Sequence, residues 1–250
     1  TNLAGQVVPE VALHALDSST NVAYDATSGS DGTATFKLEK GTYDITATWN
    51  GVNVGETSIV VSGDSRFTIY CQLTNVKIIV KSSNGIAMPL VNLNIVYHYQ
   101  SNGGSKTGSA SGQTDSSGSF TLNSSLASTT YTIDASIYNQ IFNAGNNTVS
   151  NLQNQATAQV FIICPTKTVT LSVVGNNQEP IPNARIELVE LSNGLFYSAT
   201  TDSSGSATTQ ATFGMYRAIV YKDNTLINET TVEVFSNSQQ QIRCTLFGIQ

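Results

Sequence analysis

Thr201-Asp202-Ser203-Ser204-Gly205-Ser206 is a short polar stretch that the chain repeats twice more. It returns as Thr114-Asp115-Ser116-Ser117-Gly118-Ser119 and, less strictly, as Ser28-Gly29-Ser30-Asp31-Gly32-Thr33. An Asp side chain can accept hydrogen bonds from nearby main-chain groups, and Gly tolerates the positive φ of a tight turn, so each copy predicts a turn. The three glycines Gly32, Gly118 and Gly205 lie 86 and 87 residues apart, and this period predicts a repeated domain.

Proline and cysteine mark the same three repeats. A proline precedes the first long strand expected in each repeat, and a cysteine closes each repeat, at Pro9, Pro89, Pro182, Cys71, Cys164 and Cys244. Between Cys71 and Pro89 there are 17 residues, and between Cys164 and Pro182 there are again 17. This spacing predicts a shared backbone, with domains expected at 1–74, 75–166 and 167–250.

The apolar residues alternate in a way typical of β-strands. In Tyr43 to Trp49 every second side chain is apolar, and Tyr131 to Ile137 repeats the pattern. No window sustains a helical period, and turn residues recur at intervals of roughly ten residues, as in two-sheet sandwiches. The sequence therefore predicts an all-β chain of three tandem Ig-like antiparallel β-sandwiches.

Composition limits the function. Only 11% of the 250 residues are charged and the net charge is −6, so a basic surface for nucleic acid is not expected. No apolar run has the length of a membrane span. We expect an extracellular or cell-surface protein that binds neither nucleic acid nor cofactor.

A family resemblance rests on the pattern Thr-Asp-x-x-Gly-x-(Phe/Thr), followed by Gly-Thr-Tyr or Gly-Met-Tyr at the start of an alternating strand. It resembles the carboxypeptidase regulatory-like, or transthyretin-like, modules and the related collagen-adhesin B-type repeats. The segment from Gly32 to Trp49 matches best, followed by Thr201 to Tyr221. The resemblance implies stalk, spacer or assembly modules that are not catalytic and that sometimes bind carbohydrate.

Candidate catalytic and metal groups are sparse. His14 and His98 are the two histidines, and neither has a nucleophile or metal-ligand spacing around it. A calcium site at Asp115 or Asp202 would lack the further carboxylates that calcium prefers. We therefore predict no enzyme activity and no metal.

The cysteines leave two alternatives open. One cysteine per repeat, at equivalent positions, excludes a disulfide within a domain, and the total of three is odd. Each cysteine either packs as a small apolar residue or pairs with another chain.

The two ends of the sequence suggest how the protein assembles. Only eight residues precede Pro9, and the missing part aligns with Val76 to Lys81 and with Thr168 to Val173. The first domain is therefore expected to lack its first strand. Six residues follow Cys244 where the next repeat would begin: Thr245, Leu246, Phe247, Gly248, Ile249 and Gln250.

These observations lead to a donor-strand hypothesis. A sandwich without one strand exposes unpaired backbone and a cleft over its core, which a strand from another copy can fill. We expect residues 245–250 to be the donor and Val11, Leu13 and Ala15 to line the acceptor groove. The homopolymer would grow head to tail into a filament, in principle like chaperone–usher pili, and similar in composition to the thread-like surface filaments of thermoacidophilic archaea. Two alternatives remain: residues 1–8 are the donor, or the strand lies upstream in a longer precursor.

Sugars enter the interpretation in two ways. Glycans could be attached covalently at three Asn-x-Ser/Thr sites, Asn123, Asn146 and Asn228. Alternatively, the chain is a carbohydrate-binding or adhesive stalk module of a larger surface protein, with contacts from loops of the second repeat and from aromatic residues such as Trp49, Tyr97 or Tyr99.

Overall fold

The computed structural model describes residues 1–127, 129–150, 152 and 155–245. In these described residues the regular secondary structure consists of β-strands alone, and the strands form five sheets. The prediction of an all-β chain built from Ig-like β-sandwiches is confirmed.

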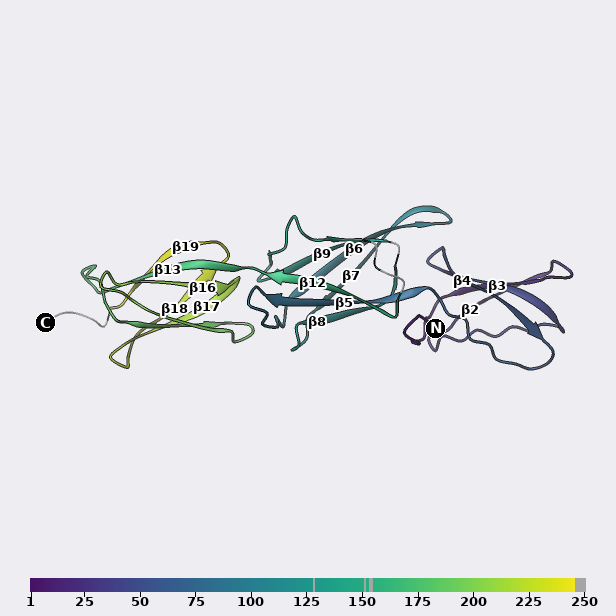
Figure 1. The fold of residues 1–250 in the computed structure, drawn as a ribbon, viewed down its shortest axis with the longest axis horizontal. Coiled ribbons are helices and arrows are strands. Elements are labelled where there is room, and N and C mark those ends of the chain that lie inside the picture. Colours follow the sequence, from purple (N-terminus) through teal and green to yellow (C-terminus); the bar gives the residue numbers. More distant parts are fainter. Residues whose placement is uncertain (128, 151, 153–154, 246–250) are drawn as a thin grey trace.

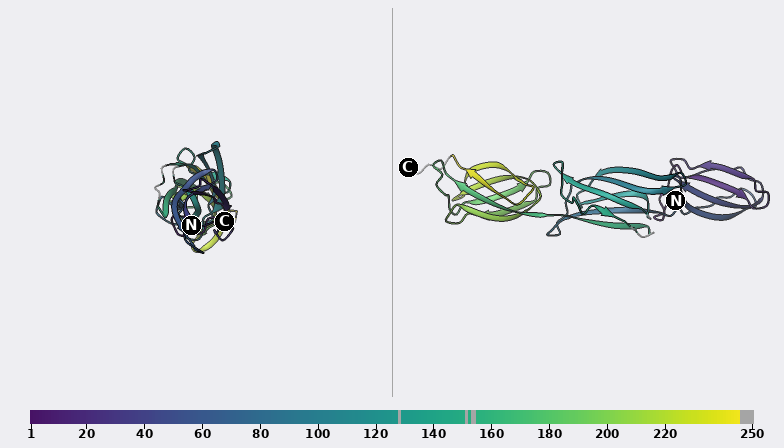
Figure 2. Two further views of the ribbon diagram at one scale, coloured as in Figure 1. Left: turned by 90° about the vertical axis from the view of Figure 1, so that its right-hand side faces the viewer. Right: turned by 90° about the horizontal axis from the view of Figure 1, so that it is seen from above.

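The strands form three blocks in one line (Figure 1). The first block holds β1 (Ala12–Asp17), β2 (Ala23–Thr27), β3 (Gly41–Trp49) and β4 (Val52–Val61). The second block holds β5 (Leu73–Ser82), β6 (Asn92–Ser101), β7 (Gly104–Gln113), β8 (Ser119–Leu126), β9 (Thr130–Ile137), β10 (Gln140–Ile141), β11 (Thr148–Val149) and β12 (Thr157–Cys164). The third block holds β13 (Thr166–Val174), β14 (Arg185–Glu190), β15 (Phe196–Thr200), β16 (Ser206–Thr212), β17 (Gly214–Lys222), β18 (Thr225–Val234) and β19 (Ser238–Arg243). In the end-on view of Figure 2 the blocks overlie one another, so the molecule is a rod.

The second and third blocks are complete two-sheet sandwiches. In the third block a sheet with the order β16-β13-β19 packs against one with the order β15-β14-β17-β18. In the second block the corresponding sheets are β12-β5-β8 and β10-β9-β6-β7, and β11 also pairs with β9. The strands of the first block form one sheet, with the order β2-β1-β3-β4.

In each block, a buried hydroxyl of the repeated turn forms hydrogen bonds with the main chain of the segment that precedes β1, β6 or β14. Thr201 Oγ1 donates to the carbonyl of Ile181 (2.7 Å) and accepts from the N–H of Ala184 (2.8 Å). Thr114 and Ser28 make the same pair of bonds in the other two blocks. The motif begins with Ser or Thr because this position satisfies two main-chain groups at once.

The Asp of the motif shapes the turn itself. Asp202 accepts hydrogen bonds from the main-chain N–H groups of Ser204 and Ser206 and from the Ser204 hydroxyl. These bonds favour the carboxylate and hold the pKa of Asp202 below its usual value, with the Ser204 hydroxyl as the largest cause. Gly205 has a φ of 72° and a β-carbon there would lie 2.7 Å from the carbonyl oxygen of Val173, so only Gly fits.

The tyrosine after each motif closes the same corner in every block. Tyr43, Tyr131 and Tyr216 are fully buried. Their hydroxyls donate to the carbonyls of Glu39 (3.1 Å), Leu126 (2.7 Å) and Thr212 (2.6 Å). This bond explains why Tyr, and not Phe, follows each turn.

Candidate functional site: an open core in the first block

In each complete block, a central strand lies between the two other strands of the smaller sheet. In the third block this is β13, which is antiparallel to β16 and parallel to β19. Val169, for example, lies between Thr209 of β16 and Ser238 of β19. In the second block β5 occupies the same place between β8 and β12.

In the first block the two flanking segments are present but no ladder joins them. Counted from the glycine of the turn and from the closing cysteine, residues 33–39 correspond to β16 and residues 65–70 to β19. Neither segment is a strand. Among the described residues, the main chain of 34–38 makes no hydrogen bond to another main-chain group. The main chain of 65–70 makes none either, apart from the bond that the carbonyl of Ile69 accepts from the amino group of Thr1, so both segments offer largely unpaired edges.

Thr1 holds the position at which the central strand would end. The N–H of Cys71 donates to the carbonyl of Thr1 (2.8 Å), as the N–H of Cys244 donates to the carbonyl of Val174 (2.8 Å), the last residue of β13. The amino group of Thr1 donates to the carbonyl of Ile69 (2.9 Å). The position of this residue fixes the register that a strand between the two segments would have.

The core next to these segments is open to solvent. Ala15, Tyr43 and Ile45 are buried there, and the apolar side chains that pack on them are only partly buried: Leu13, Tyr24, Phe36, Leu38, Ile59, Val61 and Ile69. The third block has the opposite balance, with seventeen buried residues and two partly buried ones in its cluster. Phe67, whose counterpart in β19 is the partly buried Gln240, is 45% exposed. We call the surface between residues 34–38 and 65–70 the candidate acceptor groove, after the strand-acceptor hypothesis from the sequence, and shorten this to acceptor groove below.

The other end of the first block is closed by the second block. Val8, Val11, Ala47 and Val54 form a buried cluster together with Leu73 and Leu126 from β5 and β8. The open region is therefore confined to the part of the first block that lies away from this junction.

Of the three groove residues predicted from the sequence, Leu13 and Ala15 lie in the open core, whereas Val11 lies in the buried cluster at the junction. Val11 and Ala15 are 3% and 0% exposed, and Leu13 is partly buried. Leu13 and Ala15 belong to β1, which already pairs with β2 and β3 on its two sides. They can contact an incoming side chain but offer no free backbone, and their assignment to the groove stays a prediction.

The rims of the groove were missed by the sequence reasoning. Ala34, Phe36 and Leu38 alternate with exposed polar residues, which is the pattern typical of a half-buried strand. The same alternation places Phe67 and Ile69 on one face of the second rim. This signal was available in the sequence.

The predicted donor residues lie mostly outside the described part of the chain. Residues 246–250 belong to the stretch that is not described. Thr245 is exposed and its carbonyl accepts a hydrogen bond from the side-chain amide of Asn176 (3.0 Å). The assignment of residues 245–250 as donor stays a prediction.

The three predicted glycosylation sites differ in their surroundings. Asn123, in β8, and Asn146 are exposed. Asn228 is partly buried, and its side-chain amide donates to the carbonyl of Arg243 (2.6 Å). A glycan on Asn228 would break that bond, so Asn123 and Asn146 are the better candidates.

The cysteines are buried free thiols. Cys71 is 3% exposed, and Cys164 and Cys244 are 0% exposed. Burial raises the pKa of all three thiols, that of Cys164 to about 12. Of the two alternatives left open by the sequence, this geometry favours a small buried residue over a disulfide between chains.

No other cluster in the described residues has the make-up of a reactive centre. His14 is exposed and bonds Asp25 (2.8 Å) on the neighbouring strand β2. In the part of the chain that the structure describes, no group of three or more His, Cys, Asp and Glu side chains could hold a metal ion. Nor do these residues contain a helix long and apolar enough to cross a membrane.

Comparisons with known proteins give similarities to the solved structures of a Bacillus anthracis protein and of streptococcal pilins. The Bacillus anthracis TIE protein is 16% identical with a TM-score of 0.40, and the match covers 98% of this chain and 48% of that one. A streptococcal ancillary pilin is 11% identical with a TM-score of 0.37, over 97% of this chain and 95% of that one. A minor pilin of Streptococcus agalactiae is 17% identical with a TM-score of 0.32, over 71% and 98% of the two chains. This chain thus spans about half the length of the first of these proteins. No protein-family model and no curated protein matches the sequence.

Proposed function

We propose that the protein is a structural subunit of an extracellular, pilus-like filament that grows head to tail by donor-strand complementation. The observation that carries this proposal is the acceptor groove: two unpaired backbone edges flank apolar side chains, where the other two blocks hold a central strand. A strand added there would satisfy both edges and bury the exposed apolar surface.

The occupant we propose is the segment after Cys244 of a second copy. In the complete junctions, β5 begins two residues after Cys71 and β13 begins two residues after Cys164. Leu246 is two residues after Cys244, so residues 246–250 align with 166–170 of β13. In this register Ile249 takes the place of the buried Val169, and Phe247 lies on the same face.

The same register leaves a short gap before the head of the acceptor. Thr1 takes the place of Val174, so positions 171–173 of β13 have no counterpart in residues 246–250. The donor would therefore pair along the outer part of the groove, beside Phe36 and Leu38. This gap is the reason to test the register directly.

A cross-link between two copies tests this register. The hydroxyl oxygens of Thr170 and Thr208 lie 3.0 Å apart on neighbouring strands of the third block. Their counterparts in the proposed joint are Gln250 of the donor and Thr35 of the acceptor. We expect a chain with Gln250→Cys and a chain with Thr35→Cys to form a disulfide-linked pair under mild oxidation.

The matched control moves one partner by two residues. Thr33→Cys points to the same side of its segment as Thr35→Cys but lies about 7 Å further along the strand direction. It should cross-link with Gln250→Cys more slowly, and the native cysteines compete little because they are buried. Equal yields from Thr33→Cys and Thr35→Cys would refute the register.

Deletion of residues 246–250 tests the identity of the donor. We expect the shortened chain to keep its second and third blocks folded but to form no filaments in electron micrographs. Normal filaments from this variant would show that the donor is another segment, either residues 1–8 or a strand upstream of Thr1. A full-length chain that stays monomeric and protects the amides of residues 34–38 from exchange would overturn the filament proposal itself.

A further inference from the structure

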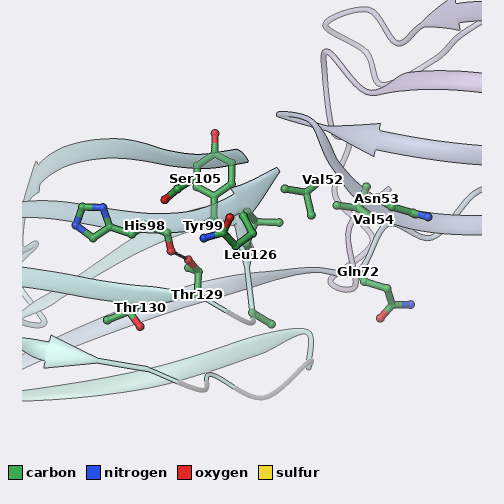
Figure 3. A pocket seen from close by; sticks show the side chains of 12 residues that line it. Val52, Asn53, Val54, Gln72, His98, Tyr99, Ser105, Leu126, Thr129 and Thr130 are labelled. Atoms are coloured by element: carbon green, nitrogen blue, oxygen red, sulfur yellow. Dashed lines mark hydrogen bonds between the residues drawn. The ribbon is translucent and has the colours of Figure 1, made fainter. Parts of the chain in front are cut away.

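The junction of the first and second blocks contains a cleft of about 430 Å³ (Figure 3). Its walls come from β4, from the β6–β7 hairpin and from the connection between β8 and β9. This volume lies within the range of small-molecule sites. We propose that this junction cleft binds a neutral saccharide.

The cleft combines an apolar part with uncharged polar groups. Val52 and Val54 of the first block lie opposite Leu126 and Tyr99 of the second, as Figure 3 shows. Asn53, Gln100, Ser105 and Thr130 add amide and hydroxyl groups around them. No Asp, Glu, Lys or Arg lies among the described residues that line the cleft.

This combination matches the chemistry of a sugar better than that of a charged ligand. A pyranose presents an apolar C–H face that packs on an aromatic ring, and an edge of hydroxyls that needs neutral donors and acceptors. Among the described residues that line the cleft, His98 is the one side chain that could carry a positive charge, so a phosphate or carboxylate would be desolvated there with little to compensate it. The cleft therefore selects against nucleotides and acidic ligands.

Tyr99 is held ready for stacking. Its ring packs on that of Tyr97 with a centroid distance of 6.0 Å and an interplanar angle of 27°. The tip of its hairpin is fixed to the first block, because the N–H of Asn102 donates to the carbonyl of Gly51 (2.8 Å). On the other wall the N–H of Gln72 donates to the carbonyl of Val54 (2.6 Å). A cleft with fixed walls loses little entropy when a ligand binds.

The hairpin that builds this wall is longer than the corresponding hairpins β1–β2 and β14–β15 of the other two blocks. Residues 101–105, which lengthen the second repeat, form the tip of the β6–β7 hairpin and reach the first block. The longer hairpin thus creates a surface at this junction alone. It has no counterpart at the junction of the second and third blocks, which is packed with Phe142, Phe213 and Phe235.

The test is a titration of the full unassembled chain with maltotriose, cellotriose and mannotriose, followed by saturation-transfer NMR and calorimetry. We expect at least one of these neutral trisaccharides to bind, and Tyr99→Ala to weaken that binding at least tenfold. Tyr99→Phe, which keeps the ring, should bind nearly as well as the native chain. Tyr70→Ala is the matched control, because Tyr70 is 63% exposed and is not among the lining residues.

A second variant guards against a folding defect. Asn53→Ala changes an exposed side chain on the opposite wall and should also weaken binding. The proposal is overturned if no neutral trisaccharide binds, if an acidic trisaccharide such as sialyllactose binds more tightly, or if neither Tyr99→Ala nor Asn53→Ala changes the affinity. None of these results depends on filament formation, so a failure of the saccharide proposal would not count against the proposed function, and the reverse also holds.

Discussion

The hydroxyl of Thr201 offers a quantitative test of how the repeated turn stabilises a block. Thr201→Val keeps the shape of this 2% exposed side chain but removes its oxygen. The carbonyl of Ile181 and the N–H of Ala184 would then lose their partner in the block interior. Each unsatisfied buried group costs about 1–3 kcal/mol, or about 2–6 kcal/mol for the two. Val no longer requires a hydroxyl to be desolvated, which offsets part of this cost, so we expect a net loss of about 2–4 kcal/mol in the free energy of unfolding.

Hydrogen exchange measured by mass spectrometry can localise this loss to the third block. A loss of about 2–4 kcal/mol corresponds to opening that is about 30 to 700 times more frequent, since about 1.4 kcal/mol is a factor of ten. Peptides from β17 should exchange faster by this factor, whereas peptides from β3 in the first block should not change. Thr201→Ser is the control, because it keeps the oxygen and loses one methyl group, about 0.8 kcal/mol. If the Val and Ser variants exchange alike, the hydroxyl does not have the role assigned to it.

Two further predictions concern the groove and the turn. In the unassembled chain, the amide hydrogens of residues 34–38 should exchange with solvent far faster than those of residues 207–211 in β16, because only β16 pairs with a central strand. Equal protection of the two segments would mean that the groove is closed. The pKa of Asp202 is lower in the folded state than its unfolded value of about 3.9. The carboxylate therefore stabilises the fold above about pH 3.9, and this stabilisation is lost as the pH falls through the folded pKa. Urea unfolding of Asp202→Asn and of the native chain should therefore differ at pH 7 and converge towards pH 3, whereas a constant difference would contradict the assignment.

Local patterns in the sequence predicted the fold well. The alternation from Tyr43 to Trp49 lies within β3, and that from Tyr131 to Ile137 lies within β9. In each of the three turns the Asp accepts a hydrogen bond from the main-chain N–H two residues on, and the Gly has a positive φ, as predicted. The bonds of the buried Ser or Thr hydroxyl were not predicted. Such features depend on residues close in sequence, and the period of the repeat made each one visible three times. The domain limits 1–74, 75–166 and 167–250 stay a prediction.

Long-range features could not be read from the sequence in the same way. The parallel pairing of β12 with β5 joins residues that are far apart in the chain, so no local pattern reveals which strand lies at the centre of the smaller sheet. For this reason the sequence pointed to Val11, Leu13 and Ala15 as groove residues but not to the unpaired segments 34–38 and 65–70 on either side of the missing strand. The junction cleft was missed because Val52 and Tyr99 come from different repeats and meet only when the blocks are packed. Tyr99 itself was predicted from the sequence as a possible sugar contact, together with Trp49 and Tyr97, but the residues opposite it were not.

The parallel pairing of the first and last strands has a mechanical consequence. The chain enters the second block at the start of β5 and leaves it at the end of β12, and eight consecutive residue pairs join these two strands. Because the strands are parallel, a force along the rod pulls them past each other lengthwise and loads their hydrogen bonds together instead of one at a time. β13 and β19 repeat this arrangement in the third block. A donor strand placed beside residues 65–70 would be loaded in the same direction, so a joint without any covalent bond could bear tension in the manner of the continuous blocks.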